Sequence, residues 1–226
     1  MKKSIRYKSH RTRLRDRYLK TGMDGLADYE LLELLLTFSI PRKDVKPLAK
    51  DLIERFGTLA NVFDAEPEDI SSVEGMGQMS SIQISLVKDL CIKYLEGKMI
   101  DTDVMSNPKA VYDFSRLIIG GKFIEFFMII FVNAKNEVSG YEVIGEGTVD
   151  NVAVYPRKIL KSAIKKNASG VILVHNHPSG HPEPSESDRE LTKEIIKASA
   201  TMELRVLDHL IVTRNNYFSF MDSGLM

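Results

Sequence analysis

The sequence predicts a small all-α domain followed by an α/β (α+β) domain built on a mixed sheet. Residues 1–97 place apolar side chains at helical spacing and contain no run typical of a strand. From residue 124 onward, strand-like and helix-like segments alternate to the end of the chain, which favours a mixed fold. A polar stretch at 98–107 separates the two parts. We therefore expect domains at 1–97 and 108–226, joined by a linker.

The first domain contains three segments with clear helical signals. A helix is expected at about 28–38. Over residues 45–56, apolar side chains recur at i, i+3, i+4, i+7 and i+8, and Gly57 ends that helix. A long segment with one apolar face extends through Tyr94, and we expect it to stop at Gly97.

The second domain begins with a helix whose first turn contains Pro108, with Asn107 as its N-cap. The next segment, 124–132, is a nearly unbroken apolar run of strand length, which is typical of a buried central strand. The elements expected after it are a strand at 138–145, a helix at 156–167, a strand at 170–174, a helix at 186–200, and strands at 205–213 and 217–220.

The composition is that of an ordinary soluble globular protein, with 43% apolar and 27% charged residues in a chain of 226. No stretch approaches eighteen consecutive apolar residues, so we expect no membrane span. The first six residues lack the apolar stretch of a signal peptide. Cys91 is the one cysteine, which excludes an intrachain disulfide and fits a reducing compartment. We expect a cytoplasmic protein.

Positive charge is concentrated at the N-terminus. Residues 1–20 contain nine lysine or arginine residues and one aspartate, a net charge of +8, in a chain that is neutral overall. Such a basic arm is typical of a segment that contacts nucleic-acid phosphates, and also of a solvated helix face. Charge alone leaves both interpretations open, so DNA is a candidate partner.

Two histidines two residues apart, His175 and His177, follow an apolar run of strand length. An extended backbone sends residues i and i+2 to the same face, so both imidazoles can converge on one point. Asp188 follows eleven residues later, at the expected start of a helix. Two imidazole nitrogens and one carboxylate form a three-ligand set for Zn²⁺ that leaves the fourth position to water. The sequence therefore predicts a hydrolytic zinc site.

These residues belong to a longer pattern, whose members are His175, His177, Pro178, Ser185 and Asp188. Counted from His177, seven residues including Pro178 precede Ser185, so the spacing is His-x-His-x₇-Ser-x₂-Asp with proline first in the seven, and it closely resembles the JAMM motif of the JAB/MPN metallo-isopeptidase superfamily. The residues around it, 163–180 and 206–212, look like the bacterial RadC family, and the resemblance is strongest over 131–220. It implies a JAB/MPN-like metallo domain preceded by a helix-hairpin-helix-like region, in a family named for DNA repair.

The resemblance implies a role for each polar member of the motif. The two histidines and Asp188 would hold zinc, and Ser185 would donate a hydrogen bond to the oxyanion formed when water attacks an amide carbonyl. The reaction would be zinc-dependent hydrolysis of a peptide or isopeptide bond. Ser185 to Asp188 also fit a capping box at the start of the next helix. Both roles can coexist, because a hydroxyl can accept one hydrogen bond while donating another.

The resemblance also implies an upstream strand glutamate as general base, and two residues are candidates. We favour Glu142, because it lies inside the expected strand 138–145 and matches a glutamate that RadC sequences carry before a Gly-Thr pair. Glu146 lies near the turn and remains the alternative. Farther along, His209 is expected to be a satisfied strand histidine, and Asp208 either orients a ligand or lies at a strand edge.

The turn Gly75-Met76-Gly77 resembles the hairpin of helix-hairpin-helix DNA-binding domains. Glycines there let the backbone approach a phosphate, and amides of the next helix bind the anion. The positions that usually carry a basic residue hold Gln78, Met79 and Ser80 instead, and a tight helix–helix turn explains the glycines equally well. The second functional hypothesis is therefore a DNA-associated accessory protein whose metal site is structural or inactive.

Overall fold

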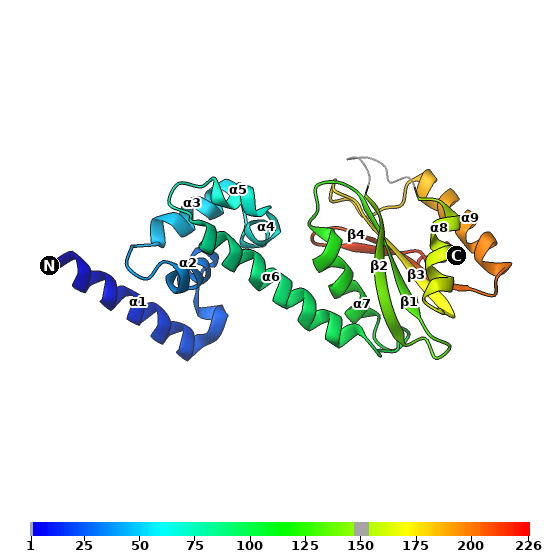
Figure 1. Cartoon of the computed structure of the whole chain (residues 1–226), viewed down its shortest axis with the longest axis horizontal. Helices are drawn as coiled ribbons and strands as arrows, with labels where there is room; N and C mark the ends of the chain where they lie inside the picture. Colours follow the sequence, from blue (N-terminus) through cyan, green and yellow to red (C-terminus); the bar gives the residue numbers. More distant parts are fainter. Residues whose placement is uncertain (1, 147–153) are drawn as a thin grey trace. The chain divides into compact units, whose positions relative to one another are not determined.

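The computed structural model of the chain describes residues 2–146 and 154–226 (Figure 1), and the side chains of residues 2–9 and of Glu146 lie outside this description. The chain divides into two compact units, Met1–Cys91 and Ile92–Met226. Within the described residues, no helix is both long enough and apolar enough to cross a membrane.

The first unit is built from helices, as the sequence predicts. They are α1 (Lys2–Thr21), η1 (Gly22–Gly25), α2 (Asp28–Ser39), α3 (Lys46–Phe56), α4 (Leu59–Asp64), α5 (Pro67–Ser71) and the first part of α6 (Gln78–Met99). The predicted stop at Gly57 is confirmed, because this residue caps α3 with a φ of 85°, a conformation that glycine adopts without strain. Fully buried leucine and isoleucine side chains of α2, α3, α5 and α6 form the core.

Part of the basic arm makes contacts within this unit. The His10 ring lies 2.7 Å from Glu33, a carboxylate that is only 1% exposed. Arg11 donates to backbone carbonyls at the end of α2, and Arg17 pairs with Glu30. The side chains of four further cations of the arm lie outside the described residues: Lys2, Lys3, Arg6 and Lys8.

The sequence predicts a linker at 98–107, and the structure corrects this prediction. These residues pack as part of the second unit. Helix α6 passes through Gly97 and ends at Met99, whose side chain is fully buried. Beyond it, Val138 accepts a hydrogen bond from the amide of Asp101 and donates one to the carbonyl of Thr102. Glycine costs a helix only about 1 kcal/mol relative to alanine, and burial of a large apolar side chain outweighs that cost.

The second unit contains a five-stranded mixed sheet with the strand order β2-β1-β3-β4-β5. Its strands are β1 (Phe126–Val132), β2 (Val138–Glu146), β3 (Gly170–Asn176), β4 (Arg205–Val212) and β5 (Tyr217–Ser219), and its helices are α7 (Pro108–Ser115), the π-helical turn η2 (Arg116–Gly120), α8 (Pro156–Lys165) and α9 (Glu186–Ala200). Only β3 and β4 run parallel, and the other neighbours pair antiparallel. The predicted mixed sheet is confirmed.

Helices cover both faces of this sheet. Figure 1 shows α7 on one side and α8 with α9 on the other. Along β3, Ile172 and Val174 pack into the core beneath α7, whereas Leu173 packs into the core beneath α8 and α9. Since side chains alternate along a strand, His175 lies on the same face as Leu173. The end of β3 therefore presents its histidine toward α9.

Gly120 and Gly97 differ in the space that the structure leaves for a side chain. A Cβ added at Gly120 would lie 2.9 Å from the carbonyl oxygen of Thr213, whereas a Cβ at Gly97 would meet nothing within 4 Å. We expect Gly120→Ala to lower the free energy of unfolding by about 1–3 kcal/mol through overpacking. Gly97→Ala should raise it by up to about 1 kcal/mol through helix propensity. Urea denaturation followed by circular dichroism measures both, and equal effects would contradict the packing described here.

Candidate metal centre

The structure brings the three predicted ligands together where β3 ends and α9 begins. His175 is the penultimate residue of β3, His177 follows the strand, and Asp188 lies in the first turn of α9. The two Nε2 atoms are 3.0 Å apart, and they lie 3.2 and 3.5 Å from the two oxygens of Asp188. Among the residues that the structure describes, this is the one His, Cys, Asp or Glu group with metal-ligand spacing.

These separations fit a small tetrahedral metal ion. Ligand atoms about 2.0–2.1 Å from a tetrahedral zinc ion lie about 3.3–3.4 Å apart. The two Nε2 atoms are 3.0 Å apart, and His175 and His177 lie 3.2 and 3.5 Å from Oδ1 and Oδ2 of Asp188, distances close to that value. Three protein ligands leave one tetrahedral position open, which is the arrangement of catalytic rather than structural zinc sites.

A hydrogen-bond chain behind His175 fixes which nitrogen faces the cluster. The hydroxyl of Thr192 donates to the carbonyl of Asp188 at 2.5 Å, so it must accept from Nδ1 of His209, 2.6 Å away. Neutral His209 therefore accepts through Nε2 from Nδ1 of His175, at 2.8 Å. This assignment, which rests on the partners of each ring nitrogen, leaves a lone pair on the His175 Nε2 that faces the other ligands.

His177 is held in the same tautomer by a simpler contact. Its Nδ1 donates to the carbonyl oxygen of His181 at 2.8 Å, because a carbonyl can only accept. Both Nε2 atoms then carry lone pairs and face each other across 3.0 Å. Two facing lone pairs at this distance repel unless a proton or a metal ion lies between them. The arrangement therefore suits a bound cation.

Burial and charge adjust the protonation of these groups. Burial lowers the pKa of His175, and it lowers that of His209 well below the ordinary value, so both rings favour the neutral form. Burial also lowers the pKa of His177, but the hydrogen bonds that the protonated ring makes to Asp188 and to the His181 carbonyl outweigh burial, and the pKa is raised. Burial raises the pKa of Asp188, but its interactions with both imidazole rings, when these are protonated, and with Ser185 hold that pKa well below its usual range.

The predicted capping box is present and also orients Asp188. The Ser185 hydroxyl accepts from the Asp188 amide at 3.2 Å, and the Asp188 carboxylate accepts from the Ser185 amide at 2.8 Å. The same hydroxyl donates to Oδ2 of Asp188 at 2.5 Å. The helix cap thus fixes the third ligand. The proton of Ser185 can serve an oxyanion only after it leaves Asp188, so the oxyanion role stays a prediction.

Glu142 lies on the metal-site face but away from the three ligands. It pairs with Ile129, two residues along β1 from Phe127, which pairs with His175. That offset amounts to about 7 Å along the strand and about 10 Å across two strand spacings. Its carboxylate accepts a hydrogen bond from Ser162 of α8 at 3.1 Å. The side chain of Glu146, the alternative base, lies outside the described residues.

A glutamate that the sequence argument did not single out, Glu125, lies closer to the ligands. The antiparallel β1–β3 ladder ends at Phe127 and His175. Glu125, two residues before Phe127, and His177, two residues after His175, lie just beyond that end. The negative charge of Glu125 helps to raise the pKa of His177. The sequence contains one signal for this residue: Glu125 is the single charged residue in the apolar run 124–132. Charged residues are rarely buried unless they are paired or functional.

The fully buried Asn176, between the two histidines, positions the segment that contains Glu125. Its Oδ1 accepts from the amide of Phe126 at 2.7 Å, and its Nδ2 donates to the carbonyl of Ile124 at 3.0 Å. These two bonds fix the backbone on either side of Glu125. Asp208 contacts none of the three ligands directly: it accepts from Ser219, Met221 and the amide of His209.

The hydrogen bond from His209 to His175 should contribute to metal affinity. His209→Phe keeps an aromatic ring against Phe220 but removes the acceptor for Nδ1 of His175. Loss of such an outer partner typically weakens metal binding about 10–100-fold. Competition with a chromophoric chelator measures the change. His181→Ala is the matched control, because it removes a histidine but keeps the carbonyl that His177 uses, and equal affinity in both variants would contradict this role for His209.

Comparison with known proteins agrees with this architecture. Residues 105–225 match the RadC-like JAB domain, and residues 5–82 match the UPF0758 N-terminal domain. A UPF0758 protein of Fusobacterium nucleatum subsp. nucleatum is 42% identical over 224 residues, which cover 96% of this chain and 97% of that protein. The mixed sheet, the helices on both of its faces and the match over more than half of the chain confirm the predicted resemblance: the chain belongs to the RadC family, with a RadC-like JAB domain as its second part.

Proposed function

We propose that this protein is a zinc-dependent hydrolase that cleaves an amide bond, in a peptide or an isopeptide. The observation that carries this proposal is the convergence of two Nε2 lone pairs and one carboxylate with donor separations of 3.0–3.5 Å. Imidazole ligands favour zinc and neighbouring transition metals over magnesium and calcium, which prefer oxygen ligands. An incomplete tetrahedral set supports catalysis, because structural zinc sites use four protein ligands.

His175, His177 and Asp188 would hold the metal. Bound zinc would supply Lewis-acid chemistry, lowering the pKa of a water molecule toward neutrality and polarising the scissile carbonyl. A carboxylate near the ligands would take the proton from the attacking water and return it to the leaving amine. Glu125 is favoured for this role by its place beside His177, and Glu142, the residue implied by the family resemblance, is the other candidate.

Zinc content tests the ligand set directly. Purified protein should hold about one zinc ion per chain, and His177→Ala should lose most of it, because two protein ligands rarely retain zinc against competition. His181→Ala, which changes an exposed histidine four residues away, should keep its zinc. Elemental analysis after dialysis measures all three proteins. Stoichiometric zinc in folded His177→Ala would remove His177 from the ligand set.

The two candidate bases can be separated by matched substitutions, Glu125→Gln and Glu142→Gln. Glutamine keeps the size of the side chain but cannot accept the water's proton, so the substitution of the base should lower hydrolysis by about 10²–10⁴-fold with zinc content intact. The readout is mass-spectrometric detection of new termini in a complex peptide mixture, with His177→Ala as background.

We expect loss of cleavage in Glu125→Gln and near-normal cleavage in Glu142→Gln. The reverse pattern would assign the base to Glu142, and zinc loss in either variant would make that residue a ligand. If the zinc-loaded protein cleaves no more than His177→Ala does, amide hydrolysis of such peptides is contradicted.

The second candidate function is a DNA-associated accessory protein with a structural or inactive metal site. It is favoured by Arg13, Arg15 and Lys20, which are exposed on α1, and by Gly75, whose φ of 90° forms the predicted tight turn before α6. Zinc-dependent cleavage that disappears in a base variant would favour the hydrolase over this candidate. DNA remains a proposed partner.

A further inference from the structure

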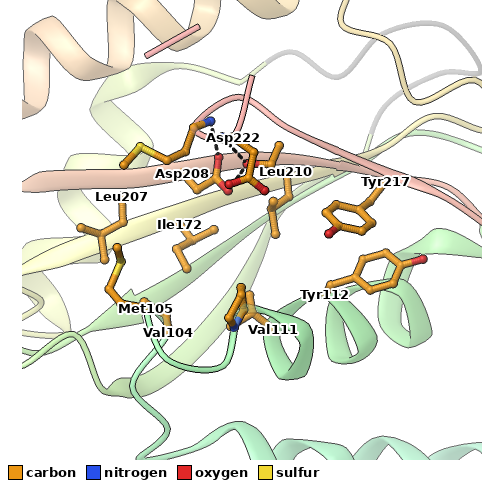
Figure 2. A pocket seen from close by; sticks show the side chains of 13 residues that line it. Val104, Met105, Val111, Tyr112, Ile172, Leu207, Asp208, Leu210, Tyr217 and Asp222 are labelled. Atoms are coloured by element: carbon orange, nitrogen blue, oxygen red, sulfur yellow. Dashed lines mark hydrogen bonds between the residues drawn. The ribbon is translucent and has the colours of Figure 1, made fainter. Parts of the chain in front are cut away.

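The second unit contains a cavity of about 160 Å³ on the sheet face opposite the metal centre. It lies between α7 and strands β3 to β5, with Val111, Ile172 and Leu210 among its apolar lining residues (Figure 2). Tyr112 and Tyr217 lie at one end, with ring centroids 4.2 Å apart. Pockets for drug-sized ligands measure about 300–1,000 Å³, so this cavity suits one long side chain or a very small molecule.

The charged residues that line this cavity are both acidic. Figure 2 shows the carboxylates of Asp208 and Asp222 close together above the apolar side chains. Neither forms an ion pair with a lysine or arginine side chain in the described part of the chain. Burial raises the pKa of Asp208 and the charge of Asp222 raises it further, although hydrogen bonds from Met221, Ser219 and His209 act in the opposite direction. Two neighbouring carboxylates without a countercharge favour a cation.

The hydrogen bonds of Asp208 indicate which cation fits. Its Oδ1 accepts from the amides of His209 and Met221, at 2.7 and 3.0 Å, and its Oδ2 accepts from the Ser219 hydroxyl at 2.7 Å. A guanidinium fork prefers both oxygens of one carboxylate, but Oδ1 of Asp208 already accepts two hydrogen bonds, so Oδ2 alone retains a free lone pair. An ammonium is a compact charge with three donors that can contact two carboxylates at once. The apolar lining suits the aliphatic stem that carries it.

We propose that this cavity binds the side chain of a lysine residue from a partner protein, with the ammonium between Asp208 and Asp222 and the aliphatic stem against Val111, Ile172 and Leu210. The cavity and the metal centre lie on opposite faces of the sheet, because Ile172 and His175 project to opposite sides of β3. The site would thus hold a partner without occupying the metal centre, and it is independent of the proposed hydrolysis.

Methyl NMR of the full chain tests this site with two matched probes. Nα-acetyl-lysine methylamide should shift the methyl signals of Val111, Ile172 and Leu210. The norleucine analogue, which has the same stem without the ammonium, should bind at least about tenfold more weakly. Asp222→Asn, at an exposed position, should weaken binding of the lysine probe about two- to fivefold. Glu194→Gln removes an exposed charge on α9 and should leave that binding unchanged.

Equal binding of the lysine and norleucine probes would overturn the charge recognition. Unchanged binding in Asp222→Asn, or an equal loss in Glu194→Gln, would reduce the effect to general surface charge and also overturn the proposal. Lysine-dependent shifts confined to methyl groups outside the cavity would exclude the cavity as the binding site.

Discussion

The candidate metal centre depends on hydrogen bonds made by ring nitrogens that face away from it. A neutral histidine can offer a lone pair to a metal through Nε2 only if its Nδ1 carries the proton. In His175 and in His177 the Nδ1–H donates a hydrogen bond to an acceptor. For His177 the acceptor is a backbone carbonyl in the next loop. For His175 it is His209, whose own tautomer is set by Thr192. Since Thr192 lies on α9 and His209 on β4, the metal-site chemistry depends on how the helix packs against the sheet.

The same elements perform structural and chemical tasks together. Asp188 completes the cap of α9 and presents its carboxylate to both histidines, so the helix N-terminus and the third ligand are fixed by one set of hydrogen bonds. Asn176 is fully buried between the two histidines and fixes the strand end that contains Glu125. Substitutions at such positions should affect stability and metal binding at the same time, which is why matched controls are needed.

The opposite face of the sheet has a different chemical character. Beneath α7, apolar side chains fill the core, and the exposed margin near β5 carries the carboxylates of Asp208 and Asp222. Asp208 accepts from the backbone of its neighbour His209, whose ring reaches the metal face. Adjacent residues of β4 thus face the candidate metal centre and the acidic cavity, because successive side chains of a strand point to opposite faces.

The sequence by itself determined the helical first part, the mixed second part and the His-x-His spacing, since periodicity, the cap at Gly57 and strand alternation are local properties. The tertiary structure decided the rest. Residues 98–107 appear polar in isolation, but backbone bonds to Val138 join them to the sheet edge. His209 and Thr192 are far from His175 in the chain, and the place of Glu125 beside His177 follows from strand register. Neither relation is local, because β pairing and helix packing bring together residues that sequence spacing does not relate.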